Sequence, residues 1–590
     1  MILLTALLLA QGLDPKALLK PPTDTWPTYN GDYSGRRFSP LTEINSGNLN
    51  ELALEWFYRI SSVGQQRGVG APTIKSTPLE VNGILYFTIP DHVFAIDART
   101  GEEIWHYGWQ DQGGHLVGNR GLGMYRDWLY FMTPDCWFVS LNAKDGKERF
   151  RKHVADEKMQ YFCTMSPLVV KSHILVGVGG DAMDVPGFLE SRDPETGDVQ
   201  WHWNSTPRKG EPGSETWPNP NSMEHGGGMT WMPGTYDPDL NLIYWGTGNP
   251  NPVFAGQGRK GSNLYTASIV AINPDTGKLA WHHQPSPHDT HDFDNVETPV
   301  LFDGLFKGKP RKMLAQAARN GIFSLLDRAT GESLVTTSFV KNNWMKGLDA
   351  KGQPIPDPAK EPKVDGSLIS MPGGGATNWP PPSFSPDTGL FYTNAKEGYS
   401  ITYLTDDDPE PQGYGGGGAG GLSEPVLLAI DYKTGKVAWK HKFPSGGFGN
   451  AYPGVLTTAG KLLFTGDPSG NFLAFDPTVD RILWHFRLGS MVSNGPSTYV
   501  LNGSQHLIVA AGDTLFSFKL IRPNRSPLQS RDPLPNRSPL HSRDPLATLP
   551  SGNPLATLHS RDPLATLHSR DPLAILPNRD RKGAGTKVQP

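Results

Sequence analysis

"AIDARTGEEIW", residues 95–105, and "AIDYKTGKVAW", residues 429–439, repeat one pattern at distant places in the chain. A small residue and an Asp lead to Thr-Gly, and a Trp follows four positions after the glycine. The pattern predicts a strand, a tight turn and a second strand. The Asp side chain can bond the turn backbone, the glycine accepts a positive φ, and the Trp can pack on a neighbouring unit.

Related segments recur through the chain and define a repeat. They are SLNAKDGKERF (140–150), SRDPETGDVQW (191–201), AINPDTGKLAW (271–281), LLDRATGESLV (325–335) and AFDPTVDRILW (474–484), with LNELALEW (49–56) as an eighth terminus at Trp56. Most spacings are about 45 to 55 residues, the length of one four-stranded propeller blade. We therefore predict an all-β, eight-bladed β-propeller with tryptophan-docking repeats. We expect its C-terminal strands, 506–520, to close against the N-terminal part, and "SFSPDTGLFY" (383–392) to form an extra hairpin.

Composition excludes several classes of protein. Lys and Arg total 54 against 58 Asp and Glu, which leaves no basic field for nucleic acid. The two cysteines, Cys136 and Cys163, are too few for a disulfide framework or a cysteine-rich metal site. No CxxCH motif occurs, so covalently attached c-type haem is excluded.

The two ends differ from the middle in composition. Residues 1–20 begin with an apolar run too short to span a bilayer, and we expect a signal peptide or an N-terminal extension there, with export to the periplasm or the medium. Residues 21–520 form the predicted propeller. Residues 521–590 repeat proline every nine positions from Pro545 to Pro572, which predicts a disordered tail, with a partner-binding linker as the alternative. No integral membrane segment is expected.

Two loop segments have a specific composition. "PHDTHDFD" (287–294) holds three acids and two histidines, and "WMPGTYDPDLNLIYWGTGNPNP" (231–252) combines aromatic residues, glycines and asparagines. The second segment resembles the pattern of dehydrogenases that use pyrroloquinoline quinone (PQQ), the family of methanol and other alcohol dehydrogenases. The similarity includes residues 26–52 and 454–476 and covers most of 24–520. Members of that family are eight-bladed propellers, in agreement with the repeat.

The resemblance implies a set of site residues. Trp231 would stack under the quinone, Asn249 would bind a metal ion through its amide oxygen, and Asp292 would touch the metal and act as the general base that takes the alcohol proton. Asp294 matches a second aspartate that adds a ligand in lanthanide-using members. Further implied cofactor contacts are Arg120, Thr164, Arg319 and Asn378. Taken singly, each residue has a structural alternative, such as a turn cap, an ion pair or a blade anchor. His288 and His291 are expected to be loop or supporting groups, because hard ions prefer oxygen.

Three positions depart from the family pattern. Ala182 replaces the family's metal-binding glutamate, and Asp181 or Asp184 is the candidate substitute, with Asp181 preferred. Lys75 replaces a glutamate near the cofactor and could bond the cofactor's carboxylates or pair with an acid. The vicinal cysteine pair that covers the quinone in methanol dehydrogenases is absent, and the region 113–115 (Gly-Gly-His) is the candidate lid. These changes fit a divergent branch, and they also fit loss of the metal.

The resemblance predicts an exported dehydrogenase that oxidises a small alcohol or polyol with PQQ and a calcium or lanthanide ion. A separate cytochrome c or quinone-linked protein would accept the electrons. The alternatives are a PQQ-dependent sugar dehydrogenase and a non-catalytic propeller scaffold such as those of outer-membrane biogenesis.

Overall fold

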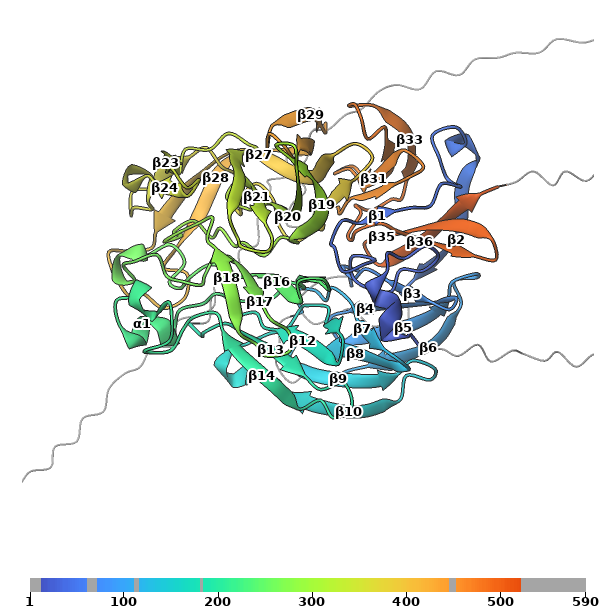
Figure 1. Cartoon of the computed structure of the whole chain (residues 1–590), viewed down its shortest axis with the longest axis horizontal. Coiled ribbons are helices and arrows are strands. Elements are labelled where there is room, and N and C mark those ends of the chain that lie inside the picture. Colours follow the sequence, from blue (N-terminus) through green and yellow to red (C-terminus); the bar gives the residue numbers. More distant parts are fainter. Residues whose placement is uncertain (1–11, 61–71, 111–115, 181–183, 445–452, 522–590) are drawn as a thin grey trace, which may run out of the picture. The chain divides into compact units, whose positions relative to one another are not determined.

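The computed structural model describes residues 12–60, 72–110, 116–180, 184–444 and 453–521. In that part of the chain eight sheets form a ring (Figure 1), so the predicted eight-bladed propeller is confirmed. Each blade has four antiparallel strands, mostly consecutive in the chain, as a repeat of about 50 residues requires, and one blade has an additional parallel strand.

The first four blades follow one another along the chain. Their strands are β3 (Leu79–Val81), β4 (Ile84–Ile89), β5 (His92–Asp97) and β6 (Glu103–Gly108); β7 (Gly123–Tyr125), β8 (Trp128–Met132), β9 (Trp137–Asn142) and β10 (Glu148–His153); β11 (Leu168–Val170), β12 (His173–Gly177), β13 (Phe188–Arg192) and β14 (Val199–Asn204); β15 (Thr235–Asp237), β16 (Leu242–Gly246), β17 (Ile269–Ile272) and β18 (Leu279–His283).

The last four blades include the elements that close the ring. Their strands are β19 (Val300–Phe306), β20 (Lys309–Ala317), β21 (Ile322–Asp327) and β22 (Ser333–Ser338); β25 (Ser367–Ile369), β26 (Ser383–Ser385), β27 (Leu390–Leu404), β28 (Gly416–Asp431) and β29 (Val437–Lys442); β1 (Phe38–Ser39), β30 (Leu456–Thr458), β31 (Leu462–Gly466), β32 (Asn471–Phe475) and β33 (Ile482–Arg487); β2 (Leu52–Arg59), β34 (Ser497–Leu501), β35 (Ser504–Ala511) and β36 (Thr514–Leu520).

Short elements lie outside the eight blade sheets. They are the two-stranded sheet of β23 (Met345–Leu348) and β24 (Pro354–Pro356), the helix α1 (Pro220–Glu224), and the 3-10 turns η1 (Pro15–Leu19), η2 (Leu49–Glu51), η3 (Glu157–Met159), η4 (Ser214–Thr216), η5 (Gly256–Gly258) and η6 (Pro358–Lys360).

The ring closes as the sequence predicts. β2 pairs antiparallel with β36, from Leu52 opposite Leu520 to Arg59 opposite Thr514, so the last blade combines N-terminal and C-terminal strands. The expected hairpin over 383–392 is also present, where β26 pairs with the start of β27.

The repeated tryptophans connect neighbouring blades. Trp105 at the end of one repeat donates from its indole to the carbonyl of Ala143 in the next blade, at 3.0 Å. A side chain at Gly146, which has a φ of 68°, would approach the Trp105 ring to 2.6 Å. A side chain at Gly101 would approach the Trp56 ring equally closely, to 2.6 Å. The glycine therefore serves both the turn and the close approach of the indole.

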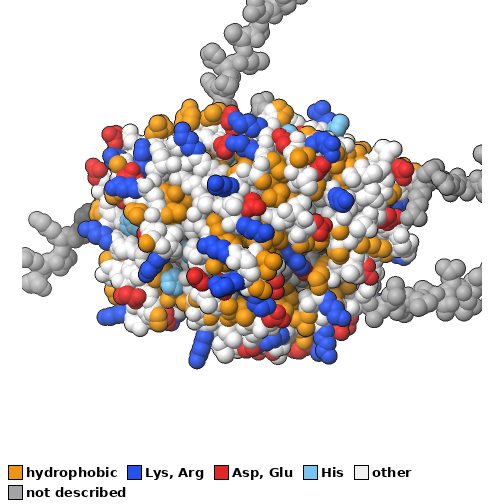
Figure 2. Space-filling view, turned by 45° about the horizontal axis from the view of Figure 1, so that its top comes forward, with side chains coloured by type: hydrophobic (Ala, Val, Ile, Leu, Met, Phe, Trp, Pro, Cys, Tyr) orange, Lys and Arg blue, Asp and Glu red, His pale blue; other side chains and the backbone are white. Residues whose placement is uncertain are grey.

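The part of the chain before the first blade is also packed. Leu13 and Leu18 are buried against the second blade. The predictions for residues 1–11 and 522–590 concern positions outside the described residues. Among the described residues, no helix has the length and apolar character needed to cross a membrane. Figure 2 shows acidic and basic side chains interspersed over the visible face, in agreement with the balanced composition.

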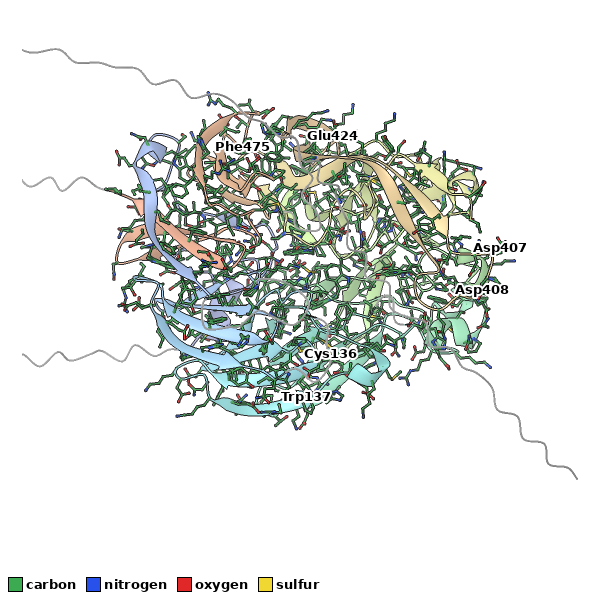
Figure 3. All side chains as sticks on the ribbon, turned by 180° about the vertical axis from the view of Figure 1, so that it is seen from behind. Cys136, Trp137, Asp407, Asp408, Glu424 and Phe475 are labelled. Carbon is green, nitrogen blue, oxygen red and sulfur yellow. A yellow bond between two sulfur atoms is a disulfide. The ribbon has the colours of Figure 1, made fainter. Side chains whose placement is uncertain are left out.

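The two cysteines form one disulfide, which the sequence analysis did not predict. Cys136 and Cys163 are bonded to each other, with their Cα atoms 5.1 Å apart. The bond joins the turn between β8 and β9 to the loop that precedes β11 (Figure 3 labels Cys136). It is a single covalent link between adjacent blades.

Candidate cofactor and metal site

The loop 287–294 owes its shape to one of its own acids. The Asp289 carboxylate accepts from the backbone amides of His291 at 3.1 Å and Phe293 at 2.8 Å. Phe293 is buried and contacts the Trp344 ring, which anchors the loop. Asp292 lies between these anchored positions with a φ of 63°, a conformation that costs energy for a non-glycine residue. The loop thereby holds the Asp292 carboxylate at a defined place.

Arg319 joins the two remaining acids of that loop. Its Nη2 lies 2.8 Å from Oδ2 of Asp292, its Nη1 lies 2.8 Å from Oδ2 of Asp294, and its Nε donates to the carbonyl of Gly374 at 2.9 Å. Burial by itself would lower the pKa of Arg319, but the neighbouring carboxylates outweigh this effect and raise it. Burial raises the pKa of Asp294, and the Arg319 charge opposes that rise.

Asn249 completes a group of oxygen donors. Its backbone amide donates to Oδ1 of Asp294 at 2.7 Å. Its own Oδ1 is buried and has no hydrogen-bond partner among the described residues. An unpaired buried acceptor is costly, and amide and carboxylate oxygens are the ligands that hard cations prefer. Within the described ranges, no group of three or more His, Cys, Asp or Glu side chains forms a metal cluster, so this donor set relies on the amide.

An aromatic slot lies beside these donors. The Arg120 guanidinium is centred 5.1 Å from the Trp231 ring and 4.9 Å from the Trp379 ring. Arg120 is 5% exposed, and its Nε and Nη1 have no partner among the described residues. Trp231 also lies beside the Asp294 carboxylate and favours its charged form, although the indole N–H is not aligned for a hydrogen bond. Trp231 thus connects the slot to the oxygen donors.

Thr164 and Asn378 form parts of the slot's wall. The Thr164 carbonyl accepts a hydrogen bond from the Arg120 backbone amide at 2.9 Å. The Thr164 hydroxyl lies 3.4 Å from the Trp231 carbonyl. The Asn378 side chain accepts from the amide of Trp379 at 2.8 Å.

Comparison of the chain with known proteins identifies the family to which it is similar. Residues 26–365 match the family model described as "PQQ: Glucose/ethanol/alcohol dehydrogenase, beta-propeller domain". The quinoprotein alcohol dehydrogenase PedH of Pseudomonas putida is 35% identical over 81% of this chain and 84% of its own length. The quinohemoprotein alcohol dehydrogenase of Comamonas testosteroni is 36% identical over 83% of this chain and 73% of that protein. The chain belongs to the PQQ-dependent alcohol dehydrogenase family.

Solved structures support the same assignment. The crystal structure of the Comamonas testosteroni enzyme superposes with a TM-score of 0.79 and 30% identity, covering 88% of this chain and 84% of that one. A europium-containing methanol dehydrogenase superposes with a TM-score of 0.74 and 27% identity, covering 86% of this chain and 99% of that one. The protein is accordingly an oxidoreductase of the PQQ-dependent alcohol dehydrogenase type.

The candidate site residues that the structure describes lie close together. Asp292, Asp294, Asn249 and Arg319 share hydrogen bonds, and Arg120, Thr164, Trp231 and Asn378 line the adjoining slot. Lys75 lies near Arg120, and its ammonium donates to the Val117 carbonyl at 2.5 Å. Burial, followed by the Arg120 charge, lowers the pKa of Lys75 to about 8.

Other predictions about the site have different outcomes. Asp181, Ala182 and the candidate lid over 113–115 lie outside the described residues. Asp184, the alternative to Asp181, accepts from the Gly413 amide with both carboxylate oxygens and so faces a different loop.

The two histidines are placed as supporting groups. His288 and His291 bond the carbonyls of Gly261 and Lys360 at 2.9 and 3.1 Å. Burial lowers the pKa of both to about 4, so both imidazoles are neutral at pH 7.

Sequence reasoning missed two ionisable residues of the site. Lys396 is 7% exposed on β27, and its ammonium donates to the Gly373 carbonyl at 3.3 Å. Burial, followed by the Arg319 charge, lowers its pKa to about 8. Glu297 is 3% exposed, and burial raises its pKa to about 8. The only sequence signal of Glu297 is its place three residues after Asp294. Lys396, which Glu397 follows directly, lies in a segment without a recognisable motif.

Proposed function

We propose that the chain oxidises a small alcohol with bound PQQ and a calcium or lanthanide ion, with Asp292 as general base. The observation that carries the proposal is the Arg319 bridge, which joins the carboxylates of Asp292 and Asp294. The Asn249 backbone amide bonds Asp294, and the Asn249 side-chain oxygen has no partner among the described residues. Family membership supplies the reaction class.

The residues present fit an anionic, aromatic cofactor. The Trp231 and Trp379 faces suit a flat ring. The Arg120 N–H groups that lack a partner in the described part of the chain suit the carboxylates of the ring. Lys75, Arg319 and Lys396 add three cations around the slot. The fit rests on charge and shape together.

The residues present also fit a hard cation. Asp292, Asp294 and the Asn249 oxygen would hold it, and three oxygen donors that include two carboxylates suit a highly charged ion. Asp294 is the residue that favours a trivalent over a divalent ion, since it adds a negative charge. The europium-containing methanol dehydrogenase is a structural neighbour that contains such an ion.

When bound, the quinone supplies the two-electron acceptor and the cation polarises it. The protein's own part is to position and to move a proton. Asp292 would accept the hydroxyl proton of the alcohol at Oδ1 or Oδ2, and Arg319 would hold that carboxylate in place through its Nη2. The buried Trp379 indole and the partly buried Trp231 indole would exclude water from the slot.

The reaction requires an external electron acceptor. A cytochrome c or a quinone-linked protein fits this role, because the sequence contains no CxxCH motif of its own. The periplasm or the medium is the proposed location, on the basis of the apolar N-terminal run.

Reconstitution tests the proposal. The purified chain is incubated with PQQ and either calcium or a light lanthanide, and dye reduction is followed with alcohols and sugars as substrates. We expect dye reduction that depends on both PQQ and metal. If none of the metals supports PQQ-dependent dye reduction, the proposed dehydrogenase activity is excluded. The alternative of a non-catalytic scaffold then remains.

A further inference from the structure

The disulfide between Cys136 and Cys163 lies next to a contact of Arg120. The two cysteines are 27 positions apart, so they are distinct from the vicinal pair that the sequence lacks. Both are buried. Thr164, which follows Cys163 directly, accepts from the Arg120 backbone amide through its carbonyl. One end of the disulfide is therefore a single residue away from the wall of the aromatic slot.

The turn that carries Cys136 is held firmly by its own contacts. The fully buried Asp135 carboxylate accepts from the Thr133 hydroxyl at 2.6 Å and from the Trp109 indole at 2.8 Å. The Cys136 amide donates to the Thr133 carbonyl at 3.0 Å. Cys136 has a φ of 61°, a conformation that a non-glycine residue keeps only where its surroundings hold it. The turn thus offers a fixed support for the loop on the other side of the disulfide.

The loop that carries Arg120 is anchored on both sides of the disulfide. The Asn119 side-chain amide donates to the Met132 carbonyl at 2.9 Å, at the end of the strand β8 that leads into the Cys136 turn. The Arg120 backbone amide donates to the Thr164 carbonyl at 2.9 Å. These two anchors belong to segments of adjacent blades. The disulfide is a covalent link between the same two segments.

The place of the Arg120 guanidinium depends on these anchors. The guanidinium is centred about equally far from the Trp231 and Trp379 rings, at 5.1 and 4.9 Å. Its Nε and Nη1 have no hydrogen-bond partner among the described residues. Since these atoms do not fix the side chain, its position over the rings is set largely by where its backbone starts. A charge-assisted contact with a planar ligand requires such a position to be kept closely.

We propose that the bond between Cys136 and Cys163 positions Arg120 for the carboxylates of bound PQQ. The inference rests on the proposed function and gives the two cysteines a part in cofactor binding. Without the bond, the Cys163 amide would still donate to the Pro134 carbonyl, at 3.2 Å. A neutral hydrogen bond yields far more readily than a covalent bond, so the two anchors of the Arg120 loop would shift relative to each other.

The first test compares PQQ affinity in two variants that both weaken the link between these blades. Cys136→Ser/Cys163→Ser removes the disulfide. Tyr130→Phe is the matched control, because the buried Tyr130 hydroxyl donates to the Pro194 carbonyl of the same neighbouring blade at 2.7 Å, away from the Arg120 anchors. Both variants should have a lower Tm. Only the double serine variant should bind PQQ about tenfold more weakly, as measured by quenching of tryptophan fluorescence. Unchanged PQQ affinity with a lower Tm would overturn the proposal.

The second test asks whether the disulfide acts through Arg120. In the Arg120→Met background, the two serine substitutions should change PQQ affinity by less than about twofold, because no guanidinium is left to be misplaced. An equal loss of affinity in both backgrounds would mean that the bond acts on another part of the slot, and would overturn the proposal. If the double serine variant does not fold, wild-type protein reduced with a phosphine takes its place, with reduction verified by alkylation and mass spectrometry.

A third measurement needs no cofactor and separates this inference from the proposed function. Hydrogen exchange of the cofactor-free protein follows the Arg120 amide in a peptide over residues 116–124. Exchange should be about tenfold faster without the disulfide and unchanged in Tyr130→Phe, since only the first change loosens the bond to Thr164. Unchanged exchange without the disulfide would overturn the proposal. If the wild type binds no PQQ, the proposed function fails, and the exchange result alone decides whether the disulfide positions Arg120.

Discussion

The guanidinium of Arg319 lies 2.8 Å from the carboxylate of Asp292, with Nη2 facing Oδ2. Its other arm makes an equivalent contact with Asp294, which is 1% exposed. One buried cation therefore balances two acids in the same loop. A metal ion bound by the same acids would share this role with Arg319, so the arginine and the metal are energetically linked.

Replacing Arg319 by methionine should destabilise the metal-free protein by about 3 to 5 kcal/mol, because it leaves Asp294 without its buried partner. Chemical unfolding measures the change. Lanthanide addition should restore more stability to Arg319→Met than to the wild type. An equal gain in both proteins would mean that Arg319 and the metal do not interact with the same carboxylates.

Replacing Asp294 by alanine should weaken lanthanide binding more than calcium binding, since the trivalent ion gains more from the second carboxylate. Titration of the PQQ-loaded protein with each ion, followed by the shift in Tm, measures the two affinities. The exposed Asp145→Ala variant serves as the control. If the affinities for calcium and for the lanthanide fell by the same factor, the case for a trivalent ion would no longer stand.

Glu297 predicts a pH dependence of stability. The pKa of Glu297 is about 8 in the folded protein, whereas the ordinary value of a glutamate is 4.5. The folded state therefore binds the proton more tightly than the unfolded state. The wild type should therefore lose stability as the pH rises from about 4.5 to 8, with no further loss above 8 from this group. Glu297→Gln lacks this loss, and its stability relative to the wild type should increase over that window by at most about 5 kcal/mol. Unfolding of the metal-free proteins from pH 5 to 9 tests this, and parallel curves would contradict it.

Lys396 should contribute to PQQ affinity although no sequence pattern indicates it. Removing its charge with Lys396→Met should weaken PQQ binding by about tenfold, through the loss of one charge-assisted contact. Quenching of tryptophan fluorescence by PQQ gives the affinity without any need for turnover. Lys440→Met, on the neighbouring strand β29, is the control. Unchanged affinity in Lys396→Met would place this lysine outside the cofactor's reach.

The blade count could be predicted from sequence because the relevant contact is local in the repeat. Several repeat tryptophans dock on the glycine turn of the next repeat, as Trp105 does on Gly146, so spacing alone reveals the architecture. The hub residues could not be derived in this way and came from resemblance to the family. Their convergence depends on ring closure, which brings Arg120 and Trp379 together across 259 positions.

Other features escaped the sequence for physical reasons. The bond between Cys136 and Cys163 joins adjacent blades, and spacing in the sequence does not reveal such a contact. Lys396 occupies a strand whose alternation does not say which positions face the hub. The environment of Glu297 depends on Arg319 and Thr377, both distant in the chain.

The most direct test of the account is the Asp292→Asn variant, loaded with PQQ and metal and measured for both PQQ affinity and turnover. The amide keeps the side chain's shape but cannot take a proton. We predict that PQQ affinity stays within about threefold of the wild type while kcat falls by about 100-fold or more. Turnover close to that of the wild type would contradict the role of Asp292 as the base.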